Sequence, residues 1–214
     1  MFRPERIYSF DSETDNSGGH GLNPLKARIT DLSLATGDGG QVFNNADEAS
    51  MLVEFDAAVR GLPAGLLSTW NGTHFDLPFL DTRFEKARIT EHGMMLEPTP
   101  QFPPKYELIP GHDSGYTCRW MSRTGTHVHL DIAYAFKPIA ERLGVTWGLK
   151  PVAEALGFHP VSLDRERLHE YTDADREEYA LSDARVTRQL TCWLLGVDVA
   201  LGMGQQTAQP TTAA

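Results

Sequence analysis

The chain has 214 residues, of which 41% are hydrophobic, which is enough apolar material for one substantial core rather than two. The formal net charge of −10 argues against an extended basic surface that grips nucleic acid along its length, because phosphate neutralisation dominates such binding. It does not exclude a nuclease whose acidic centre is neutralised by divalent cations. Residues 101–150 carry six Lys or Arg against four Asp or Glu, so the middle of the chain is the predicted substrate side.

The sequence predicts a cytoplasmic protein that makes no membrane contact. No apolar run approaches the ~18 to 20 residues that a membrane-spanning helix requires, and no apolar stretch of signal-peptide length follows the N-terminal charges. Cys118 and Cys192 lack CxxC spacing and metal-ligand neighbours. We therefore expect free thiols in a reducing compartment.

In chain order, the first half predicts an antiparallel meander followed by a strand, helix and strand crossover with some parallel pairing. The helix is indicated by apolar residues at Met51, Leu52 and Phe55, which recur at helical spacing. The predicted strands are 6–10, 29–35, 40–44 and 66–70, and the predicted helices are 46–61 and a segment from Leu77 onward.

The second half begins with a long segment, 94–126, that is rich in Pro, Gly and aromatic residues and predicts a functional insertion. It interleaves aromatic with basic residues, so it fits either a substrate-gripping flap or a packed surface loop: Tyr106, Tyr116, Trp120, Lys105, Arg119 and Arg123. A last strand at 128–130 and helices near 132–143, 149–156 and 173–195 follow. We expect one domain over residues 1–200, containing the insertion, and a disordered tail over 201–214.

Three groups of residues can carry chemistry. Asp11 and Glu13 follow the first strand at i and i+2, so their side chains point to one face, and oxygen-only ligands favour Mg²⁺ or Mn²⁺. Asp76 follows the second buried strand and opens a helix, where open α/β sheets place their sites. Tyr179 and Asp183 lie one helical turn apart on one face. Taken singly, each group also fits a purely structural role. Asp11 and Glu13 could lie in a solvated turn, Asp76 could be a helix N-cap, and Tyr179 with Asp183 could be a common helical pair.

Together and in this order, residues 10–14, 71–76 and 179–183 resemble the three motifs of the DEDD exonuclease superfamily, in its tyrosine-containing branch. The histidine branch would require His ahead of Asp183, where Tyr179 stands. Residues 70–71, 75–80 and 149–157 are more similar to the proofreading domains of family B DNA polymerases than to ribonuclease D. The resemblance covers roughly residues 6 to 195 and implies an α/β, ribonuclease H-like fold with a mixed central sheet flanked by helices.

The resemblance implies a 3′-5′ exonuclease that releases nucleoside 5′-monophosphates from a 3′ end, with two Mg²⁺ or Mn²⁺ ions about 4 Å apart. Asp11 would bridge both ions, Glu13 and Asp183 would hold the water-activating ion, and Asp76 would hold the other mainly through water. Tyr179 would orient the attacking water, because a phenol with a pKa of about 10 is a poor base at neutral pH. The implied contacts to the terminal nucleotide are Ser12, Thr14, Asn71 and Phe75.

DNA is favoured as the substrate by the family B likeness, and single strands are expected. RNA stays open, as does a non-catalytic nucleic-acid-binding or scaffold module on the same fold. No polymerase segment follows, so we expect a free-standing enzyme or a subunit with a polymerase or repair partner that the sequence does not identify. His127, His129 and Asp131 alternate in the last strand and could form a zinc site, but companion ligands are not recognisable, and polar capping of that strand is predicted instead.

Overall fold

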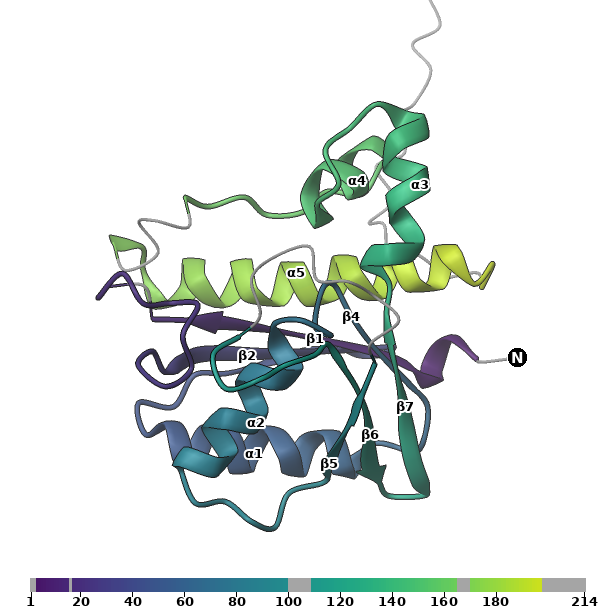
Figure 1. Cartoon of the computed structure of the whole chain (residues 1–214). Coiled ribbons are helices and arrows are strands. Elements are labelled where there is room, and N and C mark those ends of the chain that lie inside the picture. The colour runs from purple at the N-terminus through teal and green to yellow at the C-terminus, as the bar shows by residue number, and fades with distance from the viewer. Residues whose placement is uncertain (1–2, 16, 100–108, 165–169, 198–214) are drawn as a thin grey trace, which may run out of the picture.

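The computed structural model describes residues 3–15, 17–99, 109–164 and 170–197, and its centre is a seven-stranded sheet (Figure 1). The order across the sheet is β3-β2-β1-β4-β7-β6-β5. β1 is parallel to β4 and β4 to β7, whereas the other pairs are antiparallel. The strands are β1 (Ile7–Thr14), β2 (Ile29–Thr36), β3 (Gly39–Phe43), β4 (Leu66–Thr69), β5 (Met94–Pro98), β6 (Tyr116–Ser122) and β7 (Gly125–Asp131).

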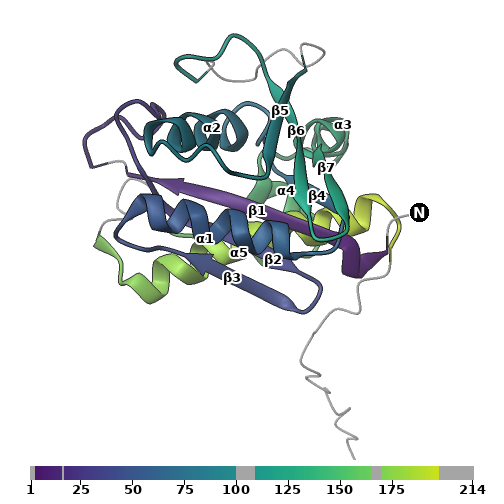
Figure 2. The same cartoon turned by 90° about the horizontal axis from the view of Figure 1, so that it is seen from below.

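Helices cover both faces of this sheet. A 3-10 turn at Pro4–Arg6 leads into β1, and the helices of the described residues are α1 (Glu48–Gly61), α2 (Asp76–Lys86), α3 (Ala133–Leu143), α4 (Leu149–Ala155) and α5 (Asp173–Leu194). α5 runs across one face over β1 and β2, and α1 and α2 lie against the opposite face (Figures 1 and 2). The predicted α/β class, with a mixed sheet flanked by helices, is confirmed.

Local signals in the sequence set where the helices begin and end. Asp47 caps α1 by accepting a hydrogen bond from the Ser50 amide, and Thr172 and Asp175 form a reciprocal capping box at the start of α5. Gly144 ends α3 with a φ of 68°, a conformation that glycine adopts without steric cost. These helix ends agree with the predicted segments to within about two residues, which is the usual uncertainty of helix boundaries.

The first strand is longer than predicted. β1 extends through Thr14, so Asp11 and Glu13 lie within the strand and not in the turn after it. The reason is its antiparallel partner, because pairs from Ser9 with Ala35 to Thr14 with Ile29 supply backbone hydrogen bonds to these polar residues. β1 pairs with β4 only through residues 7–9, so its acidic half runs past the end of the parallel pairing.

The predicted insertion at 94–126 also differs from expectation, because β5 and β6 form an antiparallel pair that extends the sheet. Trp120 is fully buried, lies edge-to-face with Phe10 and Phe55, and donates its indole N–H to Asp56 (2.8 Å). Trp120 is therefore a core residue, so of the two alternatives for this segment it follows the one in which the aromatic side chains pack on the domain. Lys105 and Tyr106 lie outside the described residues. Arg119 pairs with Glu97 at the surface (3.0 Å).

The sequence also predicts the number of domains, the character of the C-terminal tail and the relation to membranes. The strands between Ile7 and Asp131 form one sheet. The single domain over residues 1–200 stays a prediction. The tail at 201–214 lies outside the described residues. Within the described part of the chain, every helix is too short or too polar to cross a membrane.

Candidate active site

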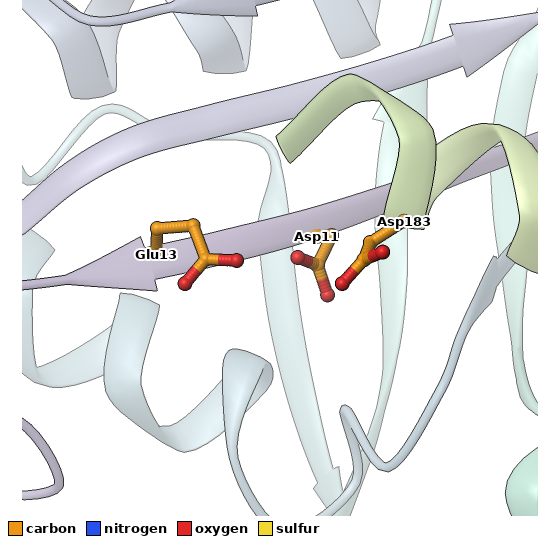
Figure 3. A group of neighbouring side chains, drawn as sticks. All are labelled: Asp11, Glu13 and Asp183. Carbon is orange, nitrogen blue, oxygen red and sulfur yellow. The ribbon is translucent and has the colours of Figure 1, made fainter. Parts of the chain in front are cut away.

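Three carboxylates from two elements converge beyond the end of the β1–β4 pairing. Asp11 and Glu13 come from β1, and Asp183 reaches toward them from α5 (Figure 3). One oxygen from each carboxylate lies within 4.8 Å of the others. The predicted convergence of Asp11 and Glu13 on one face of the strand is thus present in the structure. A cluster of oxygen ligands at this spacing suits a hard divalent cation such as Mg²⁺ or Mn²⁺.

Buried polar contacts hold α5 over the strands that carry the cluster. Arg188 donates from Nε to the Ile7 carbonyl (2.7 Å), and Thr191 donates from Oγ1 to Ser68 Oγ (2.9 Å). These contacts attach α5 to both β1 and β4. They leave Tyr179 and Asp183 one turn apart on the buried side of the helix, each 1% exposed. The predicted placement of a phenol and a carboxylate on one inward face is confirmed.

Lys150 of α4 also reaches this site. Its ammonium lies 3.3 Å from Asp183 Oδ1 and 3.7 Å from the centroid of the Tyr179 ring, and it donates to the Val161 carbonyl (2.6 Å). The Lys150 side chain is only 16% exposed. A largely desolvated ammonium in this position offsets the charge of Asp183 and lies against the face of the Tyr179 ring.

We predict that Lys150→Met destabilises the metal-free protein, because it leaves Asp183 buried without this cation. The substitution also removes the hydrogen bond from the Lys150 ammonium to the Val161 carbonyl. Losing a hydrogen bond from a charged group costs about 1.5 to 3 kcal/mol, which lowers the Tm of a chain of this size by roughly 5 to 10 °C. Added Mn²⁺ should raise the Tm of the variant more than that of the wild type, because the ion replaces the missing charge. Thermal unfolding with EDTA and with Mn²⁺ measures both effects.

Lys137→Met is the matched control, since Lys137 lies over the Trp147 ring (5.3 Å to the centroid) from an exposed position on α3. It should leave both melting temperatures nearly unchanged. Equal Tm values for Lys150→Met and Lys137→Met in EDTA would show that the Lys150–Asp183 pair contributes nothing to stability.

The fourth predicted acid, Asp76, lies beside the cluster but outside it. Its Oδ1 accepts hydrogen bonds from the Ser12 amide (3.1 Å) and the Ser12 hydroxyl (2.5 Å), so it contacts the residue between Asp11 and Glu13. The pKa of Asp76 is raised to about 7, chiefly because burial disfavours the charged carboxylate. The hydrogen bonds from Ser12 oppose this shift, and the charge of Asp131 adds to it. A nearby cation would favour the charged form of Asp76.

The four predicted substrate contacts have the following surroundings in the structure. The ring of Phe75 is partly buried, with its centroid 5.3 Å from that of Phe79. Asn71 has a φ of 66°, which is uncommon for a residue with a side chain. The Thr14 hydroxyl donates to the Gly21 carbonyl (2.7 Å), and the Ser12 hydroxyl donates to Asp76. Ser12 and Thr14 therefore have acceptor capacity left for a substrate hydroxyl.

The alternating residues of β7 do not gather as a zinc site. His127 bonds the Val59 carbonyl through Nε2 (3.0 Å), whereas His129 lies between the hydroxyls of Thr69 (2.8 Å) and Thr117 (3.2 Å). Burial lowers the pKa of both rings, that of His129 to about 4. Asp131 accepts backbone hydrogen bonds instead. Among the described residues the one cluster with metal-ligand spacing is Asp11, Glu13 and Asp183, so the predicted polar capping is the better account.

Comparison with known proteins agrees with this geometry. Residues 26–103 match the family model of the exonuclease domain of family B DNA polymerases. Among solved structures, the family B DNA polymerase of the hyperthermophilic archaeon Pyrobaculum calidifontis superimposes with a TM-score of 0.55 at 23% identity. The resemblance to the family B exonuclease domain is confirmed. The match covers 88% of this chain and 24% of the polymerase, and at this identity it establishes the shared fold. No curated protein matches the chain.

The fold explains why Asp11, Glu13 and Asp183 meet, whereas the sequence does not indicate the contacts of two further residues, Lys150 and Asp131. Lys150 lies in segment 149–157, for which the sequence offers only the resemblance to the family B proofreading domains. For Asp131 the sequence suggests a zinc ligand or, as the better account, a polar cap of the last strand, but not a contact with the turn at Asn71 and Thr73. The sequence carries no local signal for either role, because their partners lie between about 30 and 60 residues away along the chain.

Proposed function

We propose that this chain is a metal-dependent 3′-5′ exonuclease that releases nucleoside 5′-monophosphates from the 3′ end of single-stranded DNA. The observation that carries the proposal is the convergence of Asp11, Glu13 and Asp183 within 4.8 Å on a family B exonuclease fold. Tyr179 stands one turn from Asp183 and is equally buried. The family B likeness over residues 26–103 supports DNA as the substrate.

The acidic cluster fits divalent ions because its ligands are all carboxylate oxygens. Asp11, Glu13 and Asp183 would hold the ions, with Asp76 contributing from its place beside Ser12. Bound divalent ions lower the pKa of water and neutralise charge on the leaving oxygen. We assign neither Mg²⁺ nor Mn²⁺ over the other, since both accept this ligand set.

The chain's own residues then position the substrate. The Tyr179 hydroxyl orients the attacking water by a hydrogen bond. Phe75 stacks on the terminal base, and the Asn71 side chain contacts the terminal nucleotide. Ser12 and Thr14 already donate their hydroxyl protons within the protein, so they would accept from the substrate, for example from its terminal 3′-hydroxyl.

The proposal extends to the domain organisation of the chain, its partners and its cellular compartment. We treat residues 1–200 as one exonuclease domain that works alone or beside a polymerase or repair protein. Cys118 and Cys192 are both free and buried, which supports a reducing compartment, and the cytoplasm is the proposed one.

The deciding experiment incubates the chain with a 5′-labelled single-stranded DNA and with the RNA of the same sequence, each with Mg²⁺, Mn²⁺ or EDTA. We expect the DNA to shorten stepwise from its 3′ end, nucleoside 5′-monophosphates to accumulate, and EDTA to stop the reaction. Faster shortening of the RNA would instead make the chain an exoribonuclease. Binding without cleavage of either strand would make it a non-catalytic module.

A further inference from the structure

The carboxylate of Asp131 binds the turn that carries the second acidic motif. Oδ1 accepts hydrogen bonds from the Asn71 amide (2.9 Å) and the Ala133 amide (3.0 Å), and Oδ2 accepts one from the Thr73 amide (3.0 Å). Both oxygens are therefore engaged with backbone N–H groups. Charge-assisted bonds of this kind are about twice as strong as neutral ones.

Neighbouring strands bring Asp131 to this position. Asp131 is the last residue of β7 and pairs with Thr69, the last residue of β4, so it stands where the chain leaves β4 to form the turn. The Ile132 amide donates to the Thr69 carbonyl (3.0 Å), which extends the contact between the two segments by one residue. The turn and the start of α3 are thus joined through a single carboxylate.

The turn itself has a conformation that requires support. Asn71 has a φ of 66°, in the left-handed region that side-chain-bearing residues rarely occupy. Gly72 fits closely against Thr69, because a Cβ at Gly72 would lie 2.3 Å from Thr69 Oγ1. Within the turn, the Asn71 carbonyl accepts from the amides of His74 and Phe75 (both 3.1 Å), which aims the chain into α2 at Asp76.

We infer that Asp131 is a positioning residue of the proposed exonuclease site. It holds Asn71 and Thr73 so that the Asn71 side chain, the Phe75 ring and the Asp76 carboxylate face the terminal nucleotide and the metal-binding acids. Asp131 acts through the backbone of this turn and does not contact the substrate. The inference rests on the proposed function for its effect on the reaction, but the ordering of the turn can be measured without it.

Asp131→Asn tests this inference, because it keeps the shape of the side chain and replaces one acceptor oxygen with an NH₂ group that faces a backbone N–H. Hydrogen–deuterium exchange of the full-length protein, read by NMR, should show the Thr73 or Asn71 amide exchanging at least about tenfold faster. Exchange in α1 and in α5 should be unchanged. The kcat for DNA should fall about tenfold or more, since catalytic groups tolerate little misplacement. Asp38→Asn, at an exposed turn, is the matched control.

A second variant covers the case in which Asp131→Asn folds poorly. Asn71→Gly removes the cost of the left-handed φ, so the Thr73 amide should be better protected in the Asn71→Gly/Asp131→Asn double variant than in Asp131→Asn alone. Unchanged exchange at both turn amides, or faster exchange spread equally over α1 and α5, would overturn the inference. Faster exchange of the Asn71 and Thr73 amides with an unchanged kcat for DNA would also overturn it. A wild-type chain without nuclease activity would refute the proposed function, and exchange alone would then decide whether Asp131 orders the turn.

Discussion

Asp11→Ala or Asp183→Ala should lower the exonuclease rate by at least about a thousandfold, because each removes a ligand oxygen from the group that stabilises charge during cleavage. The cluster has three described members, and a divalent ion bound by the remaining two would be held weakly and out of place. The measurement is the single-turnover rate on the labelled DNA strand at saturating Mg²⁺ and at saturating Mn²⁺.

The two variants should differ in stability, which separates lost chemistry from lost folding. Asp11→Ala relieves repulsion among the acids, so its Tm in EDTA should equal or exceed that of the wild type. Asp183→Ala also removes the ion-pair partner of Lys150 (3.3 Å). Its Tm in EDTA should therefore rise less than that of Asp11→Ala, or fall below that of the wild type. In both variants, Mn²⁺ should raise the Tm less than it does in the wild type.

Glu54→Ala is the control for this pair, because Glu54 is exposed on α1, on the face of the sheet opposite α5. It should change neither the rate nor the response to metal. Substantial Mg²⁺- or Mn²⁺-dependent activity in either cluster variant would refute the assignment of these acids as the catalytic metal ligands.

Tyr179→Phe should lower the rate by roughly ten- to a hundredfold while metal binding is retained. The expected loss corresponds to one hydrogen bond to a charged or buried partner, about 1.5 to 3 kcal/mol. The substitution should remove the hydroxyl without disturbing the ring. The ring is 1% exposed and the Lys150 ammonium lies over its face, a contact that phenylalanine preserves. The effect should appear in kcat under conditions in which chemistry limits turnover.

Tyr8→Phe provides the comparison. Tyr8 is also buried, and its hydroxyl donates to the Pro63 carbonyl (3.0 Å) near the start of β1, away from the acidic half of that strand. Its removal should lower the Tm but leave kcat unchanged. If Tyr179→Phe behaved in the same way, with a lower Tm and a normal rate, Tyr179 would have a structural role only.

Short-range patterns in the sequence were sufficient to predict which side chains of the candidate site point in the same direction. The i, i+2 spacing of Asp11 and Glu13 puts them on one face of any strand, and the i, i+4 spacing of Tyr179 and Asp183 puts them on one face of any helix. The apolar periodicity of α1 is equally local. These features follow from backbone geometry over a few residues, which is why they could be predicted without a fold.

Only the tertiary structure decided how these faces meet and what else joins them. Trp120 is buried in the core, and β1 extends to Thr14 because it pairs with β2. The Asp76 carboxylate accepts a hydrogen bond from the Ser12 amide. The tertiary structure also brought Lys150 to Asp183, and Asp131 to the amides of Asn71 and Thr73. The physical reason is that burial and hydrogen bonding act between groups that are near in space, and strand order and helix docking determine which distant residues become near.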